Sequence, residues 1–159
     1  MNLWQTFEIG ENTKYCNQGI SFHYQKGIED DLKKKYTSFA RWLRKNYVFP
    51  VHINVYILNC EKVRLLNGCA AYGSFRWFKK RAPFIRIPSA IEPQLLDDYT
   101  RVEIYEQILS SLVHELSHYY QWILDLDQNN ATSERQANYF RYRINEKYNR
   151  ENAGATSTS

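Results

Sequence analysis

Two histidines and a glutamate stand close together at His114, Glu115 and His118. Residues four apart on an α-helix share one face, so the two imidazoles could bind a single metal ion from the same side. The carboxylate after the first histidine could then reach a water molecule on that metal and accept its proton. These residue types at this spacing indicate a Zn²⁺ site that activates water for hydrolysis.

A catalytic zinc ion usually has three protein ligands, so a third ligand is needed from elsewhere. No histidine or cysteine follows His118, which excludes sites that take a third such ligand downstream. Asp125 and Asp127 are candidates, but an aspartate ligand at this spacing usually follows a turn made by a glycine. No glycine occurs between His118 and Gly154. Glu134 is better placed, because it falls in the first turn of the next expected helix and can project back towards the histidines.

Other polar residues have weaker claims to the site. Asn138 lies one helical turn after the third ligand and could accept a hydrogen bond from a metal-binding histidine, although a helical asparagine is more often simply exposed. His52 lies on the polar side of an expected strand and could contact a substrate at the metal site. His23 is a weaker candidate for the same role. Tyr139 and Tyr142 are candidate oxyanion donors that spacing cannot rank.

Apolar spacing places the metal motif on the second of three expected helices. Residues 29–47 carry apolar side chains at three- and four-residue steps, which predicts an amphipathic helix. Residues 100–103 fit a capping box that begins a helix running to about residue 124. A third helix is expected over residues 132–148.

Three strands are expected between the first two helices. Residues 51–58 alternate β-branched and polar side chains, the period of a half-buried strand. Residues 69–78 and 84–87 are the second and third strands, and prolines at both ends of the third favour an edge position. The expected fold is therefore α+β, with an N-terminal helix, a small three-stranded, mostly antiparallel sheet, and two helices that carry the metal ligands.

Length and composition set the domain organisation. The 159 residues fit one domain over residues 1–150, with a loose N-terminal segment at 1–27 and a disordered polar tail at 151–159. The net charge of +4 is mild, and the short basic runs at 33–35 and 79–81 are typical of solvated surfaces. The composition therefore does not favour nucleic-acid binding.

The sequence predicts a cytoplasmic location. Residues 1–19 lack the basic and apolar regions of a signal peptide, and no run of about eighteen apolar residues predicts a membrane span. Cys16, Cys60 and Cys69 are odd in number and lack a C-x-x-C spacing, so we expect reduced thiols.

Two segments on successive expected helices combine metal-binding and apolar residues in a fixed order. They contain His114, Glu115, His118, Glu134, Ala137, Asn138 and Phe140. The second segment has the form E-x-x-A-N-x-F, and together the two resemble the minimal gluzincin metallopeptidases, especially the ImmA/IrrE-like proteins. The stretch 84–89 is also similar to the strand-then-helix entry of SprT-like peptidases, which take a third histidine that this chain lacks. The resemblance covers residues 84–142.

This resemblance implies a zincin-like fold and a zinc metalloendopeptidase. Zn²⁺ would be held by His114, His118 and Glu134, with Glu115 as the general base. An extended protein or peptide substrate would pair with a sheet edge formed by the second or third strand. Two alternatives stay open: a peptidase-like binding or regulatory module with a structural or vestigial metal, and a DNA-associated protein in which the zinc motif is accidental.

Overall fold

The computed structural model of this chain describes residues 2–10 and 13–156, with side chains up to residue 153. Within these residues it is a mixed α+β structure, so the expected class is confirmed. The helices are α1 (Asp30–Asn46), α2 (Arg101–Ile123) and α3 (Asn130–Thr156), with 3-10 helices at Gln5–Phe7 and Pro93–Asp97. The strands are β1 (Ile20–Tyr24), β2 (Ile53–Leu58), β3 (Val63–Arg64), β4 (Ala70–Ala71), β5 (Ser74–Arg76) and β6 (Phe84–Pro88).

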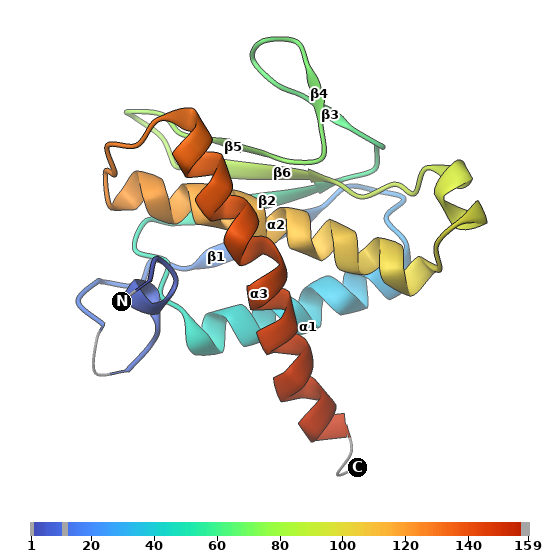
Figure 1. Cartoon of the computed structure of the whole chain (residues 1–159), viewed down its shortest axis with the longest axis horizontal. Helices are drawn as coiled ribbons and strands as arrows, with labels where there is room; N and C mark the ends of the chain where they lie inside the picture. The colour runs from blue at the N-terminus through green and yellow to red at the C-terminus, as the bar shows by residue number, and fades with distance from the viewer. Residues whose placement is uncertain (1, 11–12, 157–159) are drawn as a thin grey trace.

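The main sheet has four strands in the order β1–β2–β6–β5, and β3 and β4 form a separate pair (Figure 1). β1 pairs with β2 and β2 with β6 in parallel, and only β5 pairs antiparallel, with β6. The expectation of a three-stranded, mostly antiparallel sheet is therefore wrong. A parallel pair needs a crossover connection, and α1 supplies it between β1 and β2. The hydrophobic period of a strand does not reveal this direction.

β6 lies inside the sheet, between β2 and β5, and not at an edge as its flanking prolines suggested. Pro83 precedes the strand and Pro88 is its last residue, so neither removes an amide from the middle of the ladder. The edges are β1 and β5. The second expected strand, residues 69–78, is divided into β4 and β5 by Tyr72 and Gly73.

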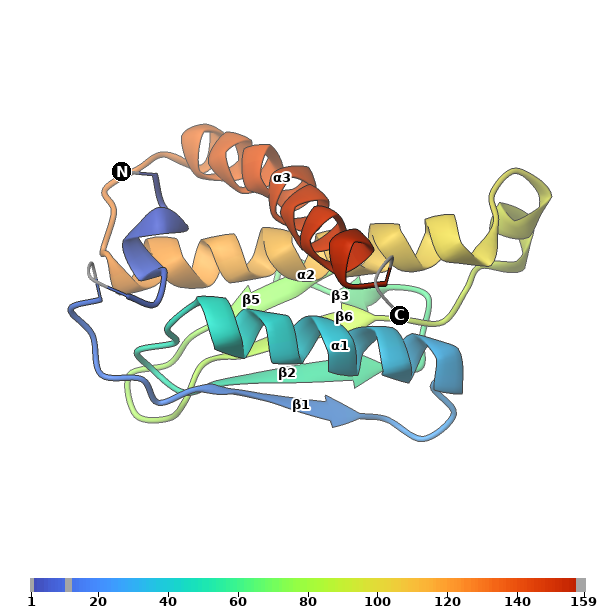
Figure 2. The same cartoon turned by 90° about the horizontal axis from the view of Figure 1, so that it is seen from below.

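The helices cover one face of the main sheet. Along β2 the side chains of Ile53, Val55 and Ile57 are fully buried, whereas Asn54 and Tyr56 between them retain exposure. The two views show α1, α2 and α3 on the same side of the strands (Figure 1, Figure 2). The sheet therefore has an inner face, covered by helices, and an open outer face.

Part of the N-terminal segment that was expected to be loose, residues 2–10, packs against α2. Trp4 is 1% exposed, and its Nε1 donates a hydrogen bond to Ser117 Oγ at 2.9 Å. Phe7 stacks on Tyr120 with the ring centroids 4.1 Å apart. These few aromatic anchors outweigh the polar composition of the segment.

The first helix that carries the metal motif, α2, begins as expected, whereas α3 begins two residues earlier than expected and is longer. Thr100 and Glu103 form the capping box before α2, and α2 ends one residue before position 124. α3 continues to Thr156, so the tail expected from Glu151 starts within a helix, and Trp42 donates a hydrogen bond to the Glu151 carboxylate. Residues 157–159 of that tail lie outside the described residues. In the described part of the chain, no helix has both the length and the apolar character to cross a membrane.

Candidate metal centre

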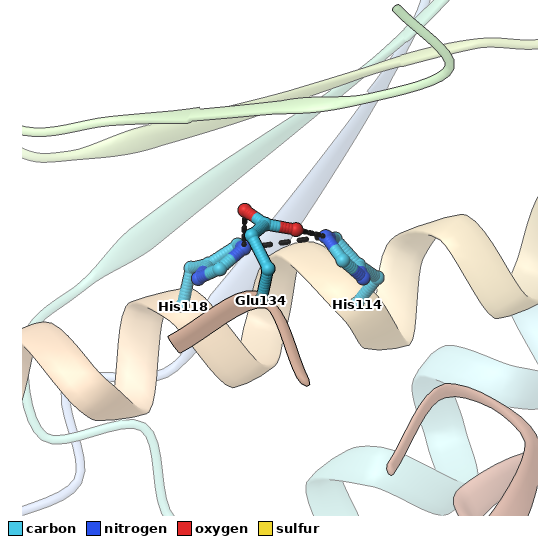
Figure 3. Close-up of side chains that lie close together, drawn as sticks. All are labelled: His114, His118 and Glu134. Carbon is cyan, nitrogen blue, oxygen red and sulfur yellow. Dashed lines mark hydrogen bonds and ion pairs between the residues drawn. The ribbon is translucent and has the colours of Figure 1, made fainter. Parts of the chain in front are cut away.

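The two histidines lie on one face of α2, and the following turn brings a glutamate back to them. Residues 124–129 connect α2 to α3. Asp125 has a φ of 51° in this connection, so an aspartate adopts the left-handed conformation for which a glycine is usual. Glu134, near the start of α3, thereby faces His114 and His118 (Figure 3).

Ligand atoms from these three residues converge on one point. Nε2 of His114 lies 3.1 Å from one oxygen of the Glu134 carboxylate, and Nε2 of His118 lies 3.0 Å from the other. The two Nε2 atoms are 3.2 Å apart. This group could hold a metal ion, and it is the trio expected from the sequence. Asp125 lines the adjoining cleft, but neither it nor Asp127 belongs to the group.

The distance between the two imidazoles is close to that around a tetrahedral metal ion. Ligand atoms that lie about 2.0–2.1 Å from zinc at tetrahedral angles are about 3.3 Å from one another. The two Nε2 atoms are 3.2 Å apart, and each faces a different oxygen of the Glu134 carboxylate. One ligand atom from each of the three residues lies within 4.8 Å of the other two, so binding an ion through a single carboxylate oxygen requires a shift of the Glu134 side chain.

Burial keeps the first histidine in the neutral form that a metal requires. Burial, together with the neighbouring His118, lowers the pKa of His114 to about 4, and the nearby Glu134 opposes the shift only in part. A neutral imidazole has a free lone pair. His114 is therefore ready to act as a ligand at neutral pH.

His118 is held by a hydrogen-bond network from the start of α3. Its Nδ1 donates to Gln121 Oε1 at 2.8 Å. The amide nitrogen of Gln121 donates to the Ser133 carbonyl at 3.0 Å and to Gln136 Oε1 at 2.8 Å, which directs the amide oxygen towards His118. A proton on Nδ1 leaves the lone pair on Nε2, the atom that faces Glu134.

The hydrogen bonds around His114 are fewer than those around His118. Nδ1 of His114 is buried and has no partner of good hydrogen-bond geometry among the described residues. Asn138 is exposed on α3 and lies near enough to raise the pKa of His114. The hydrogen bond from a ligand histidine that we expected at Asn138 stays a prediction.

Glu115 lines the same cleft and is 7% exposed. Burial raises the pKa of its carboxyl to about 8, with a further contribution from Glu134, whereas Arg141 opposes the rise. Gly73 makes room for this side chain, because a Cβ there would lie 3.1 Å from both Cγ and Oε1 of Glu115. A carboxyl group able to hold a proton therefore lies beside the candidate metal-binding trio.

Arg141 is a further cleft residue. Its Nη2 donates to Ser110 Oγ at 3.0 Å and to Ser111 Oγ at 3.3 Å. Its Nε is buried without a hydrogen-bond partner in the described part of the chain. A guanidinium held this way can donate to a carbonyl or carboxylate oxygen of a ligand in the cleft.

The trio opens into a cleft of about 790 Å³ between α2, α3 and β5. This volume is within the usual range of ligand sites. Trp77 and Trp122 stack on its wall with ring centroids 6.4 Å apart. Tyr72 and Phe75 also line the cleft, so its strand side is rich in aromatic rings.

Four residues singled out in the sequence lie away from the cleft. His23 and His52 both contact Asn54 Oδ1, at 2.8 Å and 3.3 Å, on the outer side of the sheet. Tyr139 and Tyr142 are about half exposed on α3, and neither lines the cleft. The structure therefore does not bring these four together with the trio.

Two of the residues that sequence reasoning missed have a helical signal. Gln121 is three residues after His118, and Arg141 is seven after Glu134, so each shares a helix face with a ligand. Gly73 has no such signal, because its contact with α2 joins segments far apart in the chain.

No protein-family model, curated protein or solved structure matches this chain. The case for a metal centre therefore depends on the geometry of the trio and of the cleft beside it.

Proposed function

We propose that this chain is a zinc-dependent metalloendopeptidase with a zincin-like site of the gluzincin type. The observation that carries the proposal is the convergence of His114, His118 and Glu134 beside the buried carboxyl of Glu115 in an open cleft. Two imidazoles and one carboxylate are a ligand set of catalytic zinc, which keeps a fourth position for water.

Glu115 has the position and the chemistry of the general base. Bound zinc would lower the pKa of water and polarise the carbonyl of the peptide bond. In this proposal a carboxylate oxygen of Glu115 accepts the proton of the attacking water and later gives it to the nitrogen of the leaving amine.

The substrate in this proposal is an extended peptide along β5. β5 is an edge strand, and Gly73, Ser74 and Phe75 line the cleft beside Glu115. An extended peptide can add to such an edge through main-chain hydrogen bonds. Arg141, on the opposite wall, would then donate to a main-chain oxygen of the bound peptide.

The test is cleavage of a diverse peptide mixture, read by mass spectrometry. Zinc-loaded protein should cut internal peptide bonds, chelation should stop the cutting, and added zinc should restore it. Glu146→Gln, which changes an exposed glutamate on α3, should behave as the wild type.

Failure of zinc-loaded protein to cut any peptide in the mixture would contradict the proposal. Stoichiometric, tightly held zinc in that inactive protein would favour the alternative of a binding or regulatory module with a structural metal.

A further inference from the structure

The outer face of the main sheet is open and has no acidic residue on its strands. β1, β2, β5 and β6 contain no aspartate or glutamate. Besides Leu58 and Pro88 at one end, the side chains on this face include polar, aromatic and basic ones, namely His23, Asn54, Tyr56, Arg76, Phe84 and Arg86. The connection between β5 and β6 adds three basic residues, Lys79, Lys80 and Arg81.

Aromatic rings form a row across this face. His23 on β1 stacks with Tyr56 on β2 at a centroid distance of 5.0 Å, and Tyr56 meets Phe84 on β6 at 5.9 Å. Phe84 in turn stacks with Phe78 at 5.8 Å, and the guanidinium of Arg81 lies 3.8 Å from the Phe78 ring centroid. The row is open to solvent at His23 and at Tyr56, which is 37% exposed, whereas Phe84 and Phe78 are half-buried.

Guanidinium groups gather beside the rings without an acidic partner. Nη2 of Arg86 and Nη2 of Arg76 both donate to the carbonyl of Arg64, at 2.6 Å and 3.2 Å. Burial and the charge of Arg76 lower the pKa of Arg86. Among the described residues, no carboxylate lies within ion-pair distance of Arg76 or Arg86. Their positive charge is therefore available to an anionic ligand.

We propose that the outer face binds a single-stranded nucleic acid, with bases on the ring row and phosphates beside the arginines. Aromatic side chains for the bases and basic groups for the backbone are the combination that binds single strands. A duplex keeps its base faces stacked inside, and an acidic peptide has no bases to place on the rings. This activity goes beyond the proposed peptidase and uses the opposite side of the sheet.

The experiment is fluorescence anisotropy of zinc-loaded protein with labelled oligothymidylate and oligouridylate of about twenty nucleotides. Both probes carry phosphates and unpaired bases that can stack, and their relative affinities show which of these two single strands, DNA or RNA, binds better. The proposal expects binding at low salt that weakens as salt rises. A duplex of the same length should bind more weakly.

Two substitutions on the outer face have matched controls on α3. Tyr56→Ala should weaken single-strand binding about tenfold, because it removes one stacking platform. Arg76→Gln should reduce the slope of log affinity against log salt by about 0.7, the loss of one phosphate contact. Tyr139→Ala and Arg143→Gln alter an exposed tyrosine–arginine pair on α3, with the guanidinium 3.6 Å from the ring centroid. These two controls should leave the single-strand affinity and its salt dependence unchanged.

Any of the following outcomes would overturn the proposal. Tyr56→Ala binds the single strand as tightly as the wild type, or the α3 controls lose as much affinity as the outer-face variants. The duplex binds as tightly as the single strand, or no single strand binds at low salt. Competition by a polyglutamate peptide as strong as that of the oligonucleotide would assign the face to an acidic protein partner instead. Unchanged circular dichroism and zinc content confirm that each variant is folded.

Discussion

The two sides of the main sheet are built differently. On the helix side, the candidate metal-binding trio comes from two consecutive helices, and a glutamine network and a buried glutamate surround it. On the outer face, rings and arginines come from four strands and their connections, and several of them are only half-buried. A site carried by neighbouring helices leaves a pattern in the sequence, whereas a surface assembled from distant strands does not.

The largest effect that tests this division is expected at Glu115. Glu115→Gln should slow peptide hydrolysis by about 10²–10⁴-fold, because the amide cannot accept a proton from water. Zinc content and oligonucleotide affinity should stay at the wild-type values. Initial rates, metal analysis and anisotropy measure the three quantities, and hydrolysis at a near-normal rate would remove Glu115 from its proposed role.

The helix side was predictable because its signals are local. The capping box at Thr100 and the histidines at positions 114 and 118 each depend on one stretch of helix. Glu134 followed from a short connection between two helices. The length of α3 was not predictable, because contacts such as that between Trp42 and Glu151 extend it.

The sheet was predicted less well, because strand pairing depends on partners far apart in the chain. β1 was missed within a polar segment, although β2 pairs with it in parallel. The prolines around β6 suggested an edge, but their positions at the strand ends permit an interior place. A net charge of +4 gave no hint that one face has rings and arginines without acidic residues.

A pair of neighbouring residues on β2 tests the contrast between the two faces directly. Ile57 is fully buried and Tyr56 is 37% exposed. Ile57→Ala should lower the free energy of unfolding by about 3 kcal/mol, because it leaves a cavity in the core. Tyr56→Ala should cost less than about 1 kcal/mol. Urea titration measures both, and similar losses would contradict the assignment of an open outer face.

The glutamine network should affect metal affinity more than stability of the fold. Gln121→Leu removes the acceptor that orients His118, so zinc should bind about 10–100-fold more weakly. Gln107→Leu, which changes an exposed glutamine on the same helix, is the matched control. Competition with a chromogenic chelator measures the affinity. Equal affinities for the two variants would mean that the network does not support the metal.

The smallest effect is expected at Gly73, which lies between β4 and β5 and beside Glu115 of α2. Gly73→Ala places a Cβ 3.1 Å from Glu115 and should displace its carboxylate slightly. Hydrolysis should fall about tenfold with zinc affinity unchanged, since small misplacements of catalytic groups are costly. A parallel loss of zinc would show instead that the substitution disturbs the whole site.

The metal content of Glu134→Ala tests the central claim most directly. Purified wild-type protein should hold stoichiometric zinc, measured by mass spectrometry of the metal after dialysis. Glu134→Ala should lose that zinc because it removes one of three protein ligands, while Glu146→Ala, from an exposed position on the same helix, should keep it. Retention of zinc by Glu134→Ala with wild-type affinity would contradict the three-residue metal centre.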